Sequence, residues 1–257
     1  MTDLRRRSDG RVLKIGHRGA SALEPENTLA AFRRAIELGV DFVEFDVLDL
    51  ADGTLVLAHS DDLLEVSHGA AAGRVRLLPL EELREISPQL PTLDEALDFF
   101  ASVESGVQVD VKCYRHGREV AGALRRHGLV DRAVASSFWP AALRDLRAAA
   151  PELAVGLTYP DDRYGLARRR LVAPVVPPAV HLFRRVLPRR LPRWLRATGA
   201  AVAMLHWAVL SPGALDRCHA DGAAVWTWTV NEPALRDRVL ALGVDGVISD
   251  DPRLFLQ

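Results

Sequence analysis

The sequence is poor in cysteine and lysine and has no long hydrophobic run, and these shortages exclude several classes of protein. Its two cysteines, Cys113 and Cys218, lie too far apart to indicate a disulfide framework or a cysteine metal motif. No stretch approaches the roughly 18 consecutive apolar residues of a membrane-spanning helix. The first ten residues are polar and arginine-rich, unlike a signal peptide, so we expect a cytoplasmic protein.

The charge balance and the length point to a compact enzyme. The 33 basic and 34 acidic residues give a net charge of −1, which does not indicate nucleic acid as a partner. The content of hydrophobic residues, 49%, is enough for a large core. A chain of 257 residues is close to the roughly 250 typical of a (β/α)8 barrel. We expect one domain over residues 1–257.

Short apolar runs alternate with helical patterns, and this alternation is typical of parallel βα units. The runs lie near residues 12–15, 42–46, 107–111, 133–136, 154–157, 201–205, 223–228 and 246–248. Helical patterns lie near residues 28–38, 118–127, 141–149, 212–220 and 233–242, several of them ending at glycine. Eight such runs predict a TIM (β/α)8 barrel.

One stretch interrupts this alternation. Asp52-Gly53 between two apolar runs predicts a β-hairpin, which leaves the end of the second strand. We expect it to begin a small insertion at about residues 47–105. The count of eight strands depends on leaving this hairpin out.

Two acidic residues share one face of the second predicted strand. Side chains alternate along a strand, so Glu44 and Asp46 point the same way and repel each other unless a cation lies between them. A half-exposed strand with its acids in water would give the same pattern. The neighbouring His17, Arg18 and His59 favour a metal-assisted site that cleaves phosphodiesters.

The third predicted strand adds further polar groups. In a barrel of this kind the catalytic groups lie at the carboxyl ends of the strands, where His17 and Arg18 also fall. Gln108, Asp110 and Lys112 share a face. Asp110 is a candidate third metal ligand, and Lys112, one of only two lysines, is a candidate contact for a phosphate oxygen.

A set of motifs runs in a fixed order from the first strand to the last helix. It comprises His17-Arg18-Gly19, Pro25-Glu26-Asn27-Thr28, Glu44-x-Asp46, His59, Asp110-x-Lys112, Ser137-Phe138, Trp228-Thr229-Val230-Asn231 and Gly243-Val244-Asp245-Gly246-Val247-Ile248-Ser249-Asp250-Asp251-Pro252. In these motifs the chain resembles the glycerophosphodiester phosphodiesterases. The resemblance implies a TIM barrel with a small insertion after the second strand, a divalent cation (Mg²⁺ or Ca²⁺), and hydrolysis of glycerophosphodiesters to glycerol 3-phosphate and an alcohol.

The resemblance also implies a role for each site residue. The metal ligands are Glu44, Asp46 and Asp110. His17 and His59 act as general acid and general base, which imidazoles do near neutral pH, but the sequence does not say which is which. Arg18 and Lys112 clamp the phosphate. Either water or the glycerol 2-hydroxyl could be the nucleophile.

The chain departs from the family pattern at three places. Ser60 follows the second histidine where the family has Asp, although Asp61 and Asp62 come next and are available as substitutes. The stretch Glu65-Val66-Ser67 replaces a family Arg-Thr-Thr. Asp110 replaces a family Glu, and its shorter side chain bears on metal preference because Mg²⁺ demands tighter geometry than Ca²⁺.

Aromatic residues near the strand ends have two interpretations. Trp228 shares a face with Trp226, so one or both line the substrate pocket or simply fill the barrel. Phe138 follows the fourth strand and is a candidate contact for substrate carbon. We expect Asn27 to cap the helix that follows it.

A basic segment interrupted by prolines covers about residues 160–198, with ten arginines between Arg163 and Arg196. It predicts a lid over the barrel mouth, because the prolines should disrupt a long amphipathic helix. The alternative is contact with an anionic membrane, in which case the substrate is a lysophospholipid. A barrel that binds phosphodiesters or lipid headgroups without turnover is a third possibility.

Overall fold

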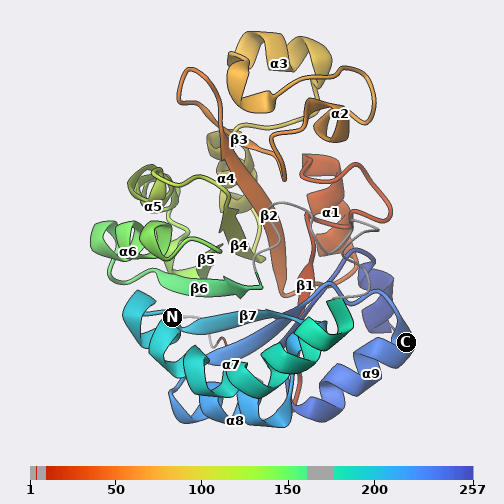
Figure 1. Cartoon of the computed structure of the whole chain (residues 1–257). Helices are drawn as coiled ribbons and strands as arrows, with labels where there is room; N and C mark the ends of the chain where they lie inside the picture. The colour runs from red at the N-terminus through yellow and green to blue at the C-terminus, as the bar shows by residue number, and fades with distance from the viewer. Residues whose placement is uncertain (1–3, 5–9, 161–175, 257) are drawn as a thin grey trace.

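Eight parallel strands form a closed barrel in the computed structural model, which describes residue 4, residues 10–160 and residues 176–256 (Figure 1). The strands are β1 (Leu13–Gly16), β2 (Phe42–Asp49), β4 (Gly106–Val111), β5 (Ala133–Ser137), β6 (Ala154–Tyr159), β7 (Val202–His206), β8 (Ala224–Trp228) and β9 (Gly246–Ser249). The ring closes because β1 pairs in parallel with both β2 and β9. The predicted TIM barrel is therefore confirmed.

Helices surround the barrel and join successive strands (Figure 1). They are α1 (Leu29–Glu37), α4 (Leu93–Ala101), α5 (Gly117–Arg126), α6 (Pro140–Ala149), α7 (Val176–Thr198), α8 (Pro212–Ala220) and α9 (Pro233–Leu242). Glycines follow several of these helices with the positive φ that lets a helix end, as at Gly39 and Gly243. The five helical patterns read from the sequence are confirmed.

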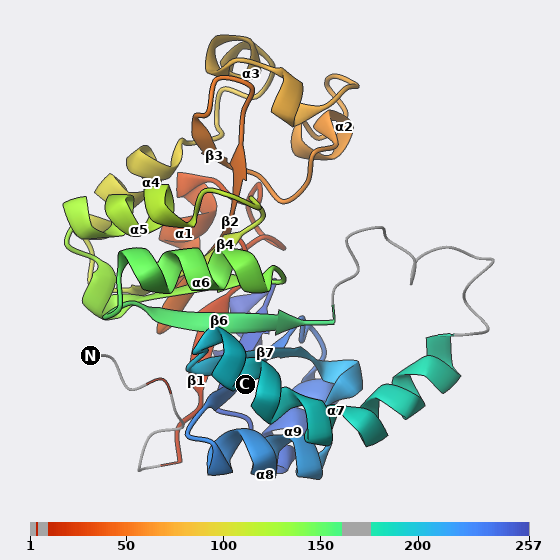
Figure 2. The same ribbon diagram turned by 60° about the vertical axis from the view of Figure 1, so that its left-hand side comes forward.

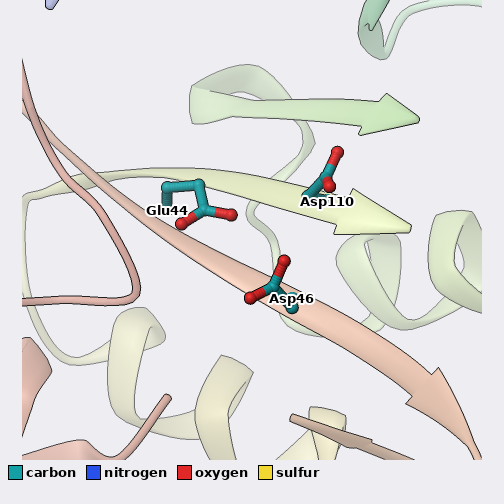
Figure 3. A group of neighbouring side chains, drawn as sticks. All are labelled: Glu44, Asp46 and Asp110. Atoms are coloured by element: carbon teal, nitrogen blue, oxygen red, sulfur yellow. The ribbon is translucent and has the colours of Figure 1, made fainter. Parts of the chain in front are cut away.

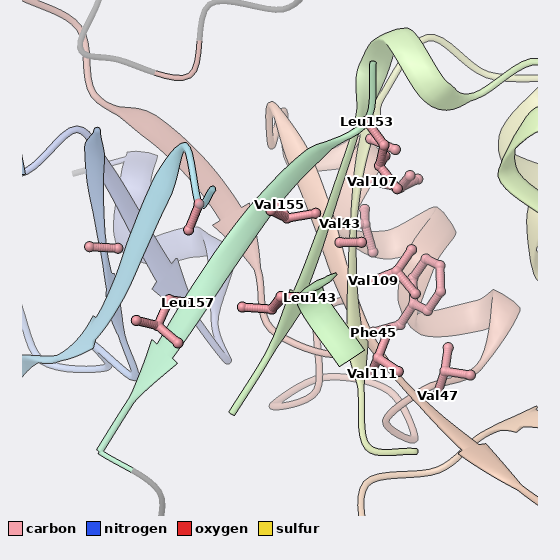
Figure 4. Packing of buried hydrophobic residues seen from close by; sticks show 14 of the residues in the cluster. Val43, Phe45, Val47, Val107, Val109, Val111, Leu143, Leu153, Val155 and Leu157 are labelled. Carbon is pink, nitrogen blue, oxygen red and sulfur yellow. The ribbon is translucent and has the colours of Figure 1, made fainter. Parts of the chain in front are cut away.

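The main hydrophobic core lies between the strands and the helices, and it decides which way β2 faces (Figure 4). The ring of Phe45 stacks on Phe100 of α4 with centroids 5.6 Å apart, and it lies at the same distance from Phe32 of α1. Because side chains alternate along a strand, this packing turns Glu44 and Asp46 into the barrel.

Large side chains fill the barrel interior at the amino-terminal end of the strands. The rings of Phe42 and Trp226 meet edge to face with centroids 5.1 Å apart, and both side chains are buried. The indole N–H of Trp226 donates to the backbone oxygen of Leu4 at 3.0 Å. Trp226 is therefore a core residue, and the polar groups of the interior lie nearer the carboxyl ends of the strands.

The predicted hairpin after β2 is present, and the chain projects from the barrel there (Figure 2). β3 (Leu55–Leu57) pairs antiparallel with β2, and the short helices α2 (Leu63–Val66) and α3 (Leu80–Ile86) pack on it around a separate hydrophobic cluster. Helix α4, by contrast, packs in the main core. The separate cluster runs from Leu48 to Leu90, inside the expected insertion at about residues 47–105, and the chain returns to the main core at α4.

Helix α7 occupies most of the described part of the basic segment. It continues through Pro188 and Pro192, so the expectation that prolines disrupt a long helix here is wrong. Leu187, Leu191 and Leu195 recur every four residues and are buried, which gives the helix an apolar face against the barrel and α8. This part of the predicted lid therefore packs on the outside of the barrel as one of its surrounding helices. Residues 161–175, the rest of the predicted lid, lie outside the described residues.

Candidate active site

Three carboxylates meet inside the barrel, as the sequence predicts (Figure 3). In the register of β2 with β4, Asp46 lies opposite Asp110, and Glu44 lies two residues earlier on the same face. One oxygen from each of the three lies within 4.8 Å of the others, and the residues are only 3%, 1% and 4% exposed for Glu44, Asp46 and Asp110. Acidic residues at this depth require a positive partner.

Two basic side chains supply part of that positive charge. Lys112 Nζ lies 3.0 Å from Asp46 Oδ1 and also donates to Asp110. Burial raises the pKa of Glu44 well above its usual range, and the adjacent Asp46 and Asp110 add to this effect. Burial acts in the same direction on Asp46, but Lys112 and Arg18 outweigh it and hold the pKa of that carboxyl well below its usual range.

The donor set fits a hard divalent cation. Three buried carboxylates face two basic groups, and the two neighbouring carboxylates add to the effect of burial in raising the pKa of Glu44. A cation held by oxygens of Glu44, Asp46 and Asp110 would offset that charge, and carboxylate oxygens are the ligands that Mg²⁺ and Ca²⁺ take in proteins.

Arg18 is fixed at the edge of the cluster by its backbone and its side chain. Its backbone N–H donates to Glu44 Oε2 at 2.8 Å, and its guanidinium donates to Glu26 at 2.7 Å. Arg18 Nε lies 3.1 Å from Asp46 Oδ2, near enough for an ion pair but not aligned for a hydrogen bond. Attraction to Asp46 and Glu26 outweighs burial, so the pKa of Arg18 lies above its usual value and the group stays charged.

Asn27 has a different role from the one expected. Thr28 is the residue that caps α1, since its side chain accepts from the N–H of Ala31. The Asn27 amide instead donates to Asp46 Oδ2 at 3.1 Å, while its oxygen accepts the backbone N–H of Asp46 at 3.0 Å. Asn27 is thus a buried residue that holds Asp46, a candidate metal ligand, through two hydrogen bonds. The prediction that Asn27 caps the helix is wrong.

His17 is held between the acid cluster and the last strand. Its Nδ1 lies 2.5 Å from Asp250 Oδ1, and its Nε2 lies 3.9 Å from Glu44 Oε2. Asp250 is held in turn by Ser21, whose hydroxyl donates to it at 3.1 Å, and by the amide of Asn231. Burial, reinforced by Arg18, lowers the pKa of His17 although Asp250 opposes this shift. Burial would raise the pKa of Asp250, but its contacts with His17, Asn231 and Ser21 together outweigh burial and lower that pKa to about 2.

His59 follows β3 and reaches the same end of the barrel. The N–H of the preceding Ala58 donates to the backbone oxygen of Asp46 at 3.2 Å, which ties this turn to β2. The positive form of His59 is near enough to help lower the pKa of Asp46. The structure therefore brings both predicted histidines to the cluster of carboxylates.

The predicted aromatic residues line the mouth of the barrel next to Lys112. Phe138 and Trp228 meet edge to face with centroids 6.1 Å apart, and Lys112 Nζ lies 5.1 Å from the centroid of Phe138. His206, which the sequence gives no reason to select, packs on Trp228 at 5.0 Å. These side chains form an apolar wall beside the charged cluster, and Trp228, unlike Trp226, lies at the open end.

Comparison with known proteins decides the family. Residues 17–254 match the glycerophosphoryl diester phosphodiesterase family. The chain belongs to this family. A glycerophosphodiester phosphodiesterase of Caldanaerobacter subterraneus subsp. tengcongensis is 29% identical over 96% of this chain and 97% of the relative.

Solved structures of family members agree with the fold. A putative glycerophosphoryl diester phosphodiesterase from Silicibacter pomeroyi is 26% identical and superposes with a TM-score of 0.77, covering 98% of this chain and 95% of the other. A phosphodiesterase from Oleispira antarctica, solved in complex with the product sn-glycerol-3-phosphate, is 25% identical with a TM-score of 0.72, covering 94% of each chain. This chain is thus an enzyme of the glycerophosphodiester phosphodiesterase class by family.

The loop that holds His17 and Arg18 depends on Gly19. At Gly19 φ is +87°, and a Cβ there would lie 2.6 Å from the backbone carbon of Ala31 in α1. We expect Gly19→Ala to lower the free energy of unfolding by about 2–5 kcal/mol, from left-handed strain plus the clash. Urea unfolding measures it. Gly39→Ala is the matched control, because φ is +76° there but no atom lies within 4 Å, so only about 1–2 kcal/mol should be lost. Equal losses would show that the contact with α1 does not matter.

Proposed function

We propose that this protein hydrolyses glycerophosphodiesters to glycerol 3-phosphate and an alcohol with the help of a divalent cation. The observation that supports this best is the meeting of Glu44, Asp46 and Asp110 in one buried cluster with His17 beside it. Family membership supports the reaction class, and the product bound to the Oleispira antarctica relative is the one expected from this reaction.

The acid cluster, the two basic residues and the aromatic wall each contact a different part of the substrate in this proposal. A cation bound by the acid cluster would neutralise the negative charge that develops on the phosphate oxygens. Arg18 and Lys112 hold the phosphate beside the cluster, and the wall of Phe138 and Trp228 contacts the carbon skeleton of the substrate.

The two histidines transfer protons. One removes the proton of the nucleophile and the other protonates the leaving alkoxide. His17 is suited to this because Asp250 is hydrogen-bonded to Nδ1, which leaves Nε2 on the side of Glu44 and the reacting groups. His59 completes the pair from the turn after β3.

The test is release of glycerol 3-phosphate from glycerophosphocholine. We expect the purified protein to release it in the presence of Mg²⁺ or Ca²⁺. A chelator should abolish release, and excess cation should restore it. Arg18 and Lys112 offset only part of the negative charge of the three carboxylates, and in this proposal the cation offsets the rest. Binding of glycerophosphocholine without turnover under all these conditions would favour the barrel that binds phosphodiesters and does not cleave them.

Lysophospholipids should be tested as a second class of substrate because of α7. Leu182 and Phe183 of this helix are 58% and 38% exposed, and they lie next to the exposed Arg184 and Arg185. Such a surface is compatible with an anionic membrane. Within the described residues no helix is both long and apolar enough to cross a membrane. Hydrolysis of lysophosphatidylcholine at this bond gives a lysophosphatidic acid and choline, so choline is the product to compare. Faster release of choline from lysophosphatidylcholine in vesicles than from glycerophosphocholine would assign the protein to the lipid substrate.

A further inference from the structure

We propose that Glu65 is a positioning residue for His59, fixing the ring so that Nδ1 carries a proton and Nε2 is left for the substrate. The inference rests on the proposed function, because it gives His59 a proton-transfer role. Glu65 belongs to the stretch in which this chain departs from its family, so the family pattern does not point to it.

The contacts around Glu65 support this role. His59 Nδ1 lies 3.0 Å from Glu65 Oε1, and the Ser60 hydroxyl donates to Glu65 Oε2 at 2.9 Å. Both carboxylate oxygens therefore bind the segment that carries the histidine. Asp62 caps α2 through the N–H of Leu64, and this short helix presents Glu65 toward His59.

No other acidic residue of this stretch is placed to do the same. Asp61 accepts from Arg74 Nε at 2.7 Å and from the backbone N–H of Arg76 at 2.9 Å. Asp62 is occupied by the helix cap. The two aspartates that follow Ser60 therefore serve other structural purposes, and Glu65 is the carboxylate of this stretch that contacts His59.

The chemistry of the contact fixes the tautomer of the histidine. An ionised carboxylate only accepts hydrogen bonds, so the ring nitrogen facing it must be the one that carries hydrogen. The hydrogen bond from His59 lowers the pKa of Glu65 to about 2, which keeps this carboxylate ionised across the working range of pH. His17 has the same arrangement, since its Nδ1 faces Asp250. Both histidines thus offer Nε2 to the substrate.

The kinetic test uses Glu65→Ala and its combination with His59→Ala. We expect Glu65→Ala to lower kcat for glycerophosphocholine by about 10- to 100-fold, with KM changed by less than about twofold, because an orienting partner acts on the proton transfer and not on binding. The side chains of His59 and Glu65 are 28% and 43% exposed, so the thermal unfolding temperature should hardly change.

The double variant separates positioning from a general structural effect. If Glu65 acts only through His59, adding Glu65→Ala to His59→Ala should lower kcat no further. The control is Glu82→Gln, an exposed residue of α3 in the same projecting part, which should leave kcat unchanged. A kcat for Glu65→Ala equal to that of the wild type, or losses that simply multiply in the double variant, would overturn the proposal.

A spectroscopic readout decides the matter without activity. We expect the ¹⁵N chemical shifts of the neutral His59 ring to report the Nδ1–H tautomer in the wild type and a mixture dominated by Nε2–H in Glu65→Ala. An unchanged tautomer would refute the positioning role. If the wild type releases no glycerol 3-phosphate but the ring shows this change, the proposed function fails while the inference about Glu65 stands.

Discussion

Replacing Glu44 by glutamine should lower kcat/KM for glycerophosphocholine by about 10³-fold or more, the equivalent of the several kcal/mol that a catalytic cation contributes. Glutamine keeps the shape of the side chain and can still accept the backbone N–H of Arg18, which Glu44 binds at 2.8 Å. The fold should therefore survive, and the free energy of unfolding should stay the same or rise, because burial opposes the charge of Glu44.

Glu37→Gln is the matched control for this change. Glu37 is an exposed residue of α1 that pairs with Arg34, so the same substitution there should leave both activity and cation binding intact. Calorimetric titration with Mg²⁺ or Ca²⁺ provides a second readout, in which Glu44→Gln should bind the cation much more weakly. Near-normal activity of Glu44→Gln would contradict the assignment of Glu44 as a ligand.

His17→Ala should lower kcat by about 10²–10⁴-fold, the range of a general acid or base. Substrate binding should change little, because Arg18 and Lys112 hold the phosphate in this account. Asp250→Asn should give a smaller loss of the same kind, since Asp250 acts by holding His17 Nδ1. Steady-state kinetics separate kcat from KM for each variant.

A histidine elsewhere with a similar partner serves as the control. His127 Nε2 lies 2.9 Å from Asp94, but His127 follows α5 at the opposite end of the barrel from the acid cluster. We expect His127→Asn to keep full activity. If His17→Ala were no worse than His127→Asn, His17 would have no part in proton transfer.

The acid cluster could be predicted because local periodicity determines it. Alternation along β2 puts Glu44 and Asp46 on one face. The apolar residues that alternate with them pack against the helices, so the two acids face the barrel interior. The parallel pairing of β2 with β4 then sets Asp46 beside Asp110 in register. Each step follows from strand geometry and burial, so a single sequence is sufficient.

The partners of the histidines could not be predicted because they depend on tertiary placement. Asp250 lies 233 residues from His17 in the chain, and only closure of the barrel through β9 and β1 brings the two together. Glu65 reaches His59 through a four-residue helix that has no periodicity to read. Asn27 sits where a helix cap is expected, and its bond to Asp46 is visible only once β2 is placed beside it.

The central claim is that one cation held by Glu44, Asp46 and Asp110 is required for hydrolysis. It is tested most directly by loading the metal-free protein stepwise with Mg²⁺ or Ca²⁺ while measuring bound ion and release of glycerol 3-phosphate in the same samples. The predicted result is a rate that rises in proportion to the fraction of chains loaded and levels off at one ion per chain. Full activity in the metal-free protein would contradict the account.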